Sequence, residues 1–216
     1  MNKIIDKIKK ALNTANRVTD PWEKHYALRE IAEVAKAQAQ DGDIQGALTT
    51  TNLITDAYWE SDALIAIAQT QAECGDNDGA LSTLQEALRS VNRMDCEYLE
   101  SQALKRISIL QFGDIDRALK TASCITIDWI RYEAIKNIAK AQAKDGDTPG
   151  ALNTASRIDY DWDRNDALRD IAKVQAQGED IEGALRTASL IDYVYCRNGA
   201  LHDIETIKKE IGVNDG

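Results

Sequence analysis

The sequence has few residues that interrupt helices or build a large aromatic core. It contains two prolines and one phenylalanine in 216 residues, and no stretch rich in serine and glycine. This composition excludes a Pro-rich or Gly/Ser linker and predicts no disordered segment. No apolar run approaches the roughly 18 residues of a membrane-spanning helix, and acidic and basic residues interrupt the N-terminal isoleucines. Neither a membrane span nor a signal peptide is expected.

Cysteine, histidine and positive charge are also scarce. The four cysteines lie far apart, without the paired spacing of a metal site, so reduced thiols and a cytoplasmic location are predicted. They are Cys74, Cys96, Cys124 and Cys196. The net charge of −10 and the pI of about 4.8 disfavour binding to nucleic acid or acidic membranes, which requires clustered Lys and Arg. His25 and His202 are too distant in sequence to predict a shared metal ion or catalytic triad.

The chain is instead dominated by an internal repeat. An Ala-Leu pair recurs in steps of 33 to 38 residues, and an aspartate precedes five of the six pairs by four positions. The alanines are Ala11, Ala47, Ala80, Ala118, Ala151 and Ala184; the aspartates are Asp43, Asp76, Asp114, Asp147 and Asp180. Such a period predicts an all-α solenoid of about six helix-turn-helix repeats. Relative to the 33-residue copies, about seven residues are added between Ala80 and Tyr98, or two helical turns, which preserves the buried face.

The stretch 128–158 shows how one repeat is built. Apolar residues recur at helical spacing on both sides of Gly146 and Asp147. Glycine can adopt the left-handed conformation that ends the first helix, and the Asp147 carboxylate can cap the second. Pro149 is tolerated in the first turn of that helix, and Asp128 is the expected cap of the first helix.

We expect one repeat domain over residues 1–216, with twelve helices. A helix over residues 3–18 is expected to close the N-terminal end with an apolar face that includes Ile4 and Ile5. A helix over residues 195–211 is expected to close the C-terminal end, because its back is polar and an end repeat must meet water. The two closed ends suggest a complete small protein.

The segment Asn137–Asp159 resembles the tetratricopeptide repeat. Ile138-Ala139 matches that family's apolar-then-small pair, and Gly146-Asp147 matches its turn. The match recurs through the chain, but the family's tyrosine position holds glutamine, its helix-B aromatic is alanine, and its closing proline is missing. The sequence is therefore similar to a divergent tetratricopeptide array, with the pentatricopeptide fold as a structural neighbour.

The resemblance implies a right-handed superhelix whose concave wall is lined by the first helix of each repeat. Seven cations would then form a row on that wall. They are Arg29, Lys105, Lys136, Lys140, Arg169, Lys173 and His202. The row suggests a groove for an acidic peptide. Pairing within one helix, such as Lys136 with Glu133 or Arg169 with Asp166, is the competing interpretation, and solvated pairs of this kind contribute only about 0–1 kcal/mol.

Other motifs predict no chemistry. The stretch 159–163 alternates acids like a calcium loop, but Arg164 stands where that loop needs glycine and Asp170 where it needs glutamate. One aromatic residue occurs near the start of the first helix of every repeat, and we interpret this row as packing between repeats. Its members are Trp22, Tyr58, Tyr98, Trp129, Trp162 and Tyr195. The family's clamp for a terminal carboxylate is not reproduced, since Glu33 and Ala66 replace asparagine.

The sequence therefore predicts a non-catalytic scaffold for protein–protein interaction, without cofactor, metal or catalytic residue. A peptide or protein segment would bind in the concave groove, steered by the basic row. Two alternatives remain open: RNA binding by pentatricopeptide-like repeats, which the negative charge disfavours, and a structural module that self-associates. The sequence leaves the partner and the oligomeric state undetermined.

Overall fold

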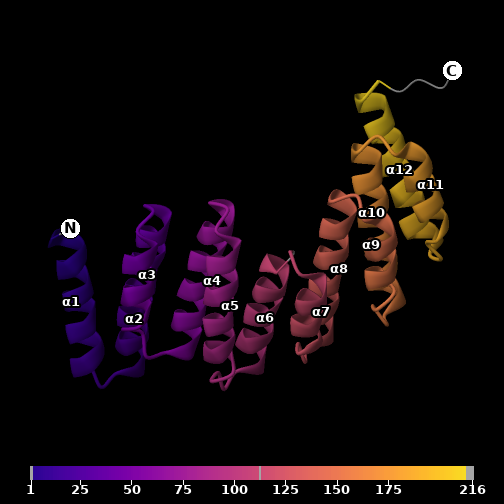
Figure 1. The fold of residues 1–216 in the computed structure, drawn as a ribbon. Helices are drawn as coiled ribbons and strands as arrows, with labels where there is room; N and C mark the ends of the chain where they lie inside the picture. Colours follow the sequence, from indigo (N-terminus) through magenta and orange to yellow (C-terminus); the bar gives the residue numbers. More distant parts are fainter. Residues whose placement is uncertain (1, 112, 213–216) are drawn as a thin grey trace. The chain divides into compact units, whose positions relative to one another are not determined.

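The computed structural model describes residues 2–111 and 113–212, and in this range all regular elements are helices (Figure 1). The predicted all-α architecture of about six repeated helix pairs is confirmed. The helices are α1 Asn2–Arg17, α2 Pro21–Gln40, α3 Ile44–Thr51, α4 Ala57–Glu73, α5 Asn77–Val91, α6 Glu97–Leu110, α7 Ile115–Ser123, α8 Asp128–Lys144, α9 Thr148–Ala155, α10 Asp161–Gln177, α11 Ile181–Ser189 and α12 Val194–Glu210. The side chains of residues 2–5, 7 and 16 lie outside the description, and with them the predicted apolar face of Ile4 and Ile5.

The helices pack in chain order within two compact units, residues 1–110 and 111–216. The even-numbered helices are here called A helices and the odd-numbered helices that follow them B helices; within each unit, neighbouring A helices pack on one another. In the first unit α2 packs on α3 and α4, and in the second α10 packs on α8, α9, α11 and α12. The single domain expected over residues 1–216 stays a prediction.

The turn between α8 and α9 follows the predicted chemistry. Gly146 has a φ of +84°, the left-handed conformation that glycine adopts without strain. The Asp147 carboxylate accepts a hydrogen bond from the backbone N–H of Gly150 at 2.9 Å. Aspartates at the four other turns accept the equivalent bond, so all five predicted caps are confirmed. The four aspartates besides Asp147 are Asp43, Asp76, Asp114 and Asp180.

A buried glutamine strengthens these turns. Gln142 donates from Nε2 to Asp147 Oδ2 at 3.2 Å and accepts from Thr154 Oγ1 at 2.6 Å. The same Gln–Asp–Thr lock joins Gln175, Asp180 and Thr187, and it recurs at residues 38–43–50 and 71–76–83. In each lock the glutamine amide bonds both the capping aspartate and the threonine of the next helix, so one side chain satisfies the cap and the next helix together.

The predicted cap at Asp128 is wrong, whereas the predicted insertion after Ala80 is confirmed. Asp128 is the first residue of α8 and does not cap it; the N-cap is Ile127, and Asp128 instead forms an ion pair with Arg131. The seven extra residues after Ala80 do lengthen a helix, since α5 has 15 residues and α3 has 8.

The core within each unit is formed largely by alanine and isoleucine, and Ile138, Ala139 and Ile158 are fully buried. Small alanine side chains allow neighbouring helices to approach closely.

Candidate functional site

The A helices of the first unit are linked by one carboxylate. Asp62 on α4 accepts Lys36 of α2 at 2.5 Å through Oδ2 and Arg106 of α6 at 2.5 Å through Oδ1. Burial alone would raise the pKa of Asp62, but hydrogen bonds from Lys36 and Arg106 and their charges lower it below its ordinary value. Burial opposes the charge of Lys36 too, yet its hydrogen bonds to Asp62 and Glu33 raise its pKa. This cluster joins three successive A helices.

The A helices of the second unit carry a ladder of ion pairs. Lys136 and Lys140 of α8 reach Asp166 and Asp170 of α10, at 2.7 and 3.3 Å. Arg169 of α10 reaches Asp203 of α12 at 2.9 Å. The sequence suggested Asp166 as a partner of Arg169 within one helix, whereas this carboxylate binds Lys136 of the neighbouring helix. The ladder reduces the positive charge that this face offers to an acidic partner.

The pKa values in the ladder reflect this pairing. Burial disfavours the charged form of Lys136, but its hydrogen bond to Asp166 and the charge of that carboxylate outweigh burial and raise the pKa of the lysine. The hydrogen bond to Asp203 raises the pKa of Arg169 despite some burial. Asp163 behaves differently: burial and the nearby charge of Asp166 raise its pKa, although Lys136 acts in the opposite direction.

The remaining members of the predicted basic row have different surroundings. Lys173 and His202 are exposed, and Lys105 is half-buried. Arg29 is exposed, and its guanidinium carbon lies 5.9 Å from the centre of the Trp59 ring. Trp59 is buried and donates from Nε1 to His25 Nδ1 at 3.2 Å. The structure thus connects Lys136, Lys140 and Arg169 through carboxylates that sequence reasoning did not assign to the site.

Five large aromatic side chains of the second unit, here called the aromatic edge, are 47% to 77% exposed. They are Trp129, Tyr160, Trp162, Tyr193 and Tyr195. Trp129, Trp162 and Tyr195 occupy equivalent positions in the first turns of α8, α10 and α12, and α10 packs against both of the others. The Trp162 and Tyr195 rings lie 6.5 Å apart with planes only 15° apart, and Tyr193 meets Trp162 edge-on at 6.1 Å.

The interpretation of the aromatic row as packing between repeats is therefore largely wrong. Trp22, Tyr98 and Trp129 are at least 49% exposed, and only Tyr58 is half-buried, against Trp59. The Trp162–Tyr195 contact does join two repeats, but both rings keep a large exposed surface. Isoleucine and alanine fill the space between helices, so the aromatic rings are not needed there.

A repeated backbone contact holds the loops of the aromatic edge. In the second unit, the loop after each of α7, α9 and α11 contains a fully buried isoleucine whose carbonyl accepts a hydrogen bond from an arginine of the next A helix. The pairs are Arg131 to Ile125 at 3.0 Å, Arg164 to Ile158 at 3.4 Å and Arg197 to Ile191 at 2.8 Å. The buried isoleucine fixes the loop from inside and the arginine satisfies its backbone. The aromatic residues that follow are consequently directed outward from a fixed loop.

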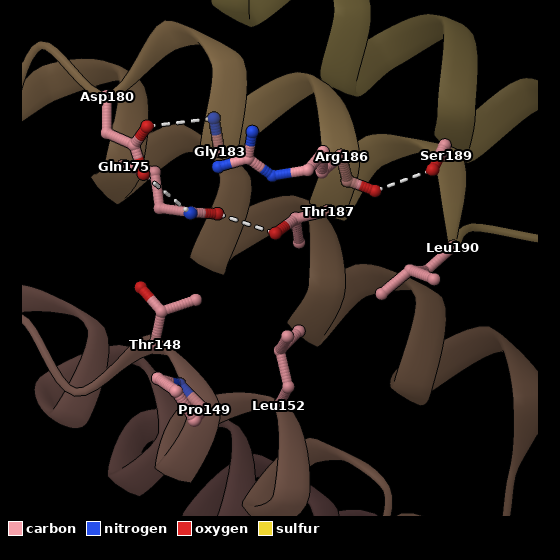
Figure 2. A pocket seen from close by; sticks show the side chains of 10 residues that line it. All are labelled: Thr148, Pro149, Leu152, Gln175, Asp180, Gly183, Arg186, Thr187, Ser189 and Leu190. Carbon is pink, nitrogen blue, oxygen red and sulfur yellow. Dashed lines mark hydrogen bonds between the residues drawn. The ribbon is translucent and has the colours of Figure 1, made fainter.

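An open pocket of about 580 Å³ lies between α9 and α11 (Figure 2). Thr148, Pro149 and Leu152 line it from α9, opposite the Gln175–Thr187 hydrogen bond (Figure 2). Most of its lining is apolar, and the polar groups of the Gln–Asp–Thr lock already bond to one another. The pocket therefore offers apolar surface and few free hydrogen-bonding groups.

The described residues show neither a metal-binding cluster nor a membrane-spanning helix. Among the described residues, no group of three or more His, Cys, Asp or Glu side chains is arranged to hold a metal ion. No helix of residues 2–111 and 113–212 is both long and apolar enough to cross a membrane. The four cysteines are free; Cys196 is buried and the other three are exposed.

Comparisons with known proteins add little. No protein-family model matches the chain, and no curated protein matches it. Among solved structures the chain is similar to the crystal structure of Ton1535 from Thermococcus onnurineus NA1, with 15% identity over 93% of this chain and 84% of that chain. The TM-score is 0.30, so the similarity supports no conclusion about function.

Proposed function

We propose that this chain is a non-catalytic scaffold of divergent tetratricopeptide-like repeats that binds a protein or peptide segment. The observation that carries the proposal is the aromatic edge. Exposed clusters of large apolar side chains are uncommon on monomers and mark interaction sites, and Trp and Tyr are enriched among the residues that dominate binding energy. The free cysteines also agree with a reducing compartment such as the cytoplasm.

The way the aromatic edge is held also favours binding. Arg131, Arg164 and Arg197 fix the loops through backbone carbonyls, so the rings are ordered before any partner arrives. A pre-ordered surface loses less conformational entropy on association than a flexible one. The shifted pKa values of Lys36, Asp62, Lys136 and Arg169 have a structural explanation, because each group forms an ion pair between helices. They call for no catalytic role.

The predicted acidic partner of the basic row remains a separate hypothesis about the same function. Reversing Lys136, Lys140 or Arg169 would also break ion pairs between helices, so lost binding would have two explanations. Lys173 and His202 are exposed and offer a cleaner test. Changing both to Glu should weaken an acidic partner that binds this face while leaving the ion-pair ladder in place.

Affinity capture from native lysate can test the scaffold and its surface together. Four immobilised proteins are compared: wild type, W162A/Y195A, K173E/H202E and W22A. Trp22 is the matched control, because it occupies the same repeat position in the first unit and is 72% exposed. We expect wild type and W22A to retain the same proteins and W162A/Y195A to lose them. Identical captured proteins for all four would contradict a role for the aromatic edge.

The two alternative functions have direct tests. Filter binding with single-stranded RNA at low salt would show a Kd in the micromolar range or tighter if the repeats read RNA. Light scattering over a hundredfold range of protein concentration would show a rising mass if the chain self-associates. The scaffold proposal expects weak RNA binding and a constant mass, since the chain carries a net charge of −10.

A further inference from the structure

Two adjacent loops of the aromatic edge carry the same short motif, Asp-Tyr-x-aromatic. It occurs as Asp159-Tyr160-Asp161-Trp162 and again 33 residues later as Asp192-Tyr193-Val194-Tyr195. Tyr160 and Tyr193 are the N-cap residues of α10 and α12, and both have extended backbone conformations. The motif therefore occupies the same structural position in two A helices that pack on one another.

The two copies present aromatic rings and carboxylates together. The Trp162 and Tyr195 rings are nearly parallel, and they are 47% and 77% exposed. Asp159 and Asp192 are exposed, and in the described part of the chain no ion pair involves either carboxylate. By contrast, Asp161 is paired with Arg164. Arg164 and Arg197 bond backbone carbonyls of these loops and not the two carboxylates, so each loop combines an aromatic face with a carboxylate that forms no ion pair among the described residues.

We propose that this part of the aromatic edge binds a basic polypeptide segment, with arginine side chains against Trp162 and Tyr195 and close to Asp159 and Asp192. The inference rests on the proposed function and names the chemical class of the partner. A guanidinium is planar and weakly hydrated, so it stacks on an aromatic face while it donates hydrogen bonds to a carboxylate. Lysine makes the same charge contact without the planar stack.

Charge complementarity favours a basic segment over nucleic acid or an acidic peptide. The carboxylates of the motif repel phosphate groups, which opposes nucleic acid although its bases could stack on the rings. They also repel an acidic peptide. Two equivalent sites on adjacent helices favour a segment with several arginines, because the second contact forms without a new loss of translational freedom.

Labelled peptides provide the test. Three 12-residue peptides, acetylated and amidated, share a Gly/Ser backbone and carry four arginines, four lysines or four glutamates. Fluorescence anisotropy at low salt should give the order Arg, Lys, Glu from tightest to weakest, and added salt should weaken the first two. W162A/Y195A should lose about tenfold or more in affinity for the arginine peptide, whereas W22A should match wild type.

Two further variants separate the contribution of the carboxylates from that of the aromatic rings. D159N/D192N should weaken both basic peptides and reduce their salt dependence, and D145N is the control at an exposed aspartate of another turn. Y195A alone covers the case in which the double aromatic variant does not fold, and circular dichroism checks each protein. Equal binding of all three peptides, or an equal loss in W22A, would overturn the inference.

The outcomes distinguish this inference from the scaffold proposal. Suppose W162A/Y195A loses its captured lysate proteins but the arginine peptide does not bind wild type. The aromatic edge would then still be a binding surface, and the basic partner would be wrong. RNA binding that depends on Trp162 and Tyr195 would instead overturn both the basic segment and the protein partner.

Discussion

Replacing Gln142 with leucine tests whether the Gln–Asp–Thr lock holds each helix pair together. Gln142 is 6% exposed, and leucine has a similar volume, so the change leaves little cavity. It removes two hydrogen bonds: the one that Gln142 accepts from the Thr154 hydroxyl and the one that it donates to Asp147. Thr154 is only 1% exposed, so water cannot replace the lost acceptor. A buried hydroxyl without a partner costs about 1–3 kcal/mol.

Gln142→Leu should therefore lower the thermal midpoint by about 2–12 °C, given about 2–4 °C per kcal/mol for a chain of this size. Thr154→Val should cost a similar amount, because it leaves the Gln142 carbonyl oxygen without its donor. The double variant replaces both partners with apolar groups and should cost less than the sum, by about 1 kcal/mol or more.

Unfolding in urea, followed by circular dichroism, measures wild type, both single variants and the double variant. Gln38→Leu is a matched control: Gln38 makes the same bonds but is half-buried, so water can replace them and the loss should be smaller. Additive effects of the two single changes would refute the lock as a coupled unit. A loss at Gln38 equal to that at Gln142 would show that burial does not set the magnitude.

Three other predictions follow from the described contacts. Gly150→Ala should destabilise by more than about 1 kcal/mol, since a Cβ there would lie 1.9 Å from the Asp147 carboxylate; Gly113→Ala, with nothing within 4 Å, is the control. Asp62→Asn should lower the thermal midpoint at pH 7 and lower it less at pH 3. The pKa of Asp62 is lowered in the folded state, so its stabilisation is complete above its unfolded pKa of about 4 and declines progressively as the pH falls towards the folded-state pKa. Asp163→Asn should raise the midpoint at pH 7, and the gain should vanish below about pH 4, because the raised pKa of Asp163 makes its ionised form unfavourable in the folded state. Thermal scans at both pH values check the last two, and a fall on Asp163→Asn at pH 7 would contradict the sign.

The sequence was sufficient for the helices because their signals are local. Gly146 and Asp147 end one helix and begin the next through contacts within a few residues, and the five capping aspartates all behave as predicted. The prediction for Asp128 was wrong for a local reason too. A carboxylate in the first helical position can satisfy the helix dipole while it pairs with Arg131 one turn later, so it need not cap.

The charge ladder was beyond sequence reasoning because its partners are distant along the chain. Lys136 and Asp166 are 30 residues apart, while the sequence alone offers Glu133 at a helical spacing of three. The position of each residue within its repeat could have predicted these pairs. Ala134 and Ala167 occupy equivalent positions 33 residues apart in α8 and α10; Lys136 lies two residues after Ala134, and Asp166 lies one residue before Ala167. Once neighbouring A helices are known to pack side by side, these two positions are expected to meet.

The aromatic edge shows a different limit of sequence reasoning. A tryptophan at a fixed repeat position suggests packing, because burial of a large ring is the usual source of its contribution to stability. Trp162, however, lies between Asp161 and Asp163, in the first turn of α10, and burying the ring deeply would desolvate these two carboxylates as well. The raised pKa of Asp163 shows that even partial burial of a neighbour already has this effect. Acids on both sides of an aromatic residue at a helix start therefore favour an exposed ring, and the same reasoning applies to Tyr160, which lies between Asp159 and Asp161.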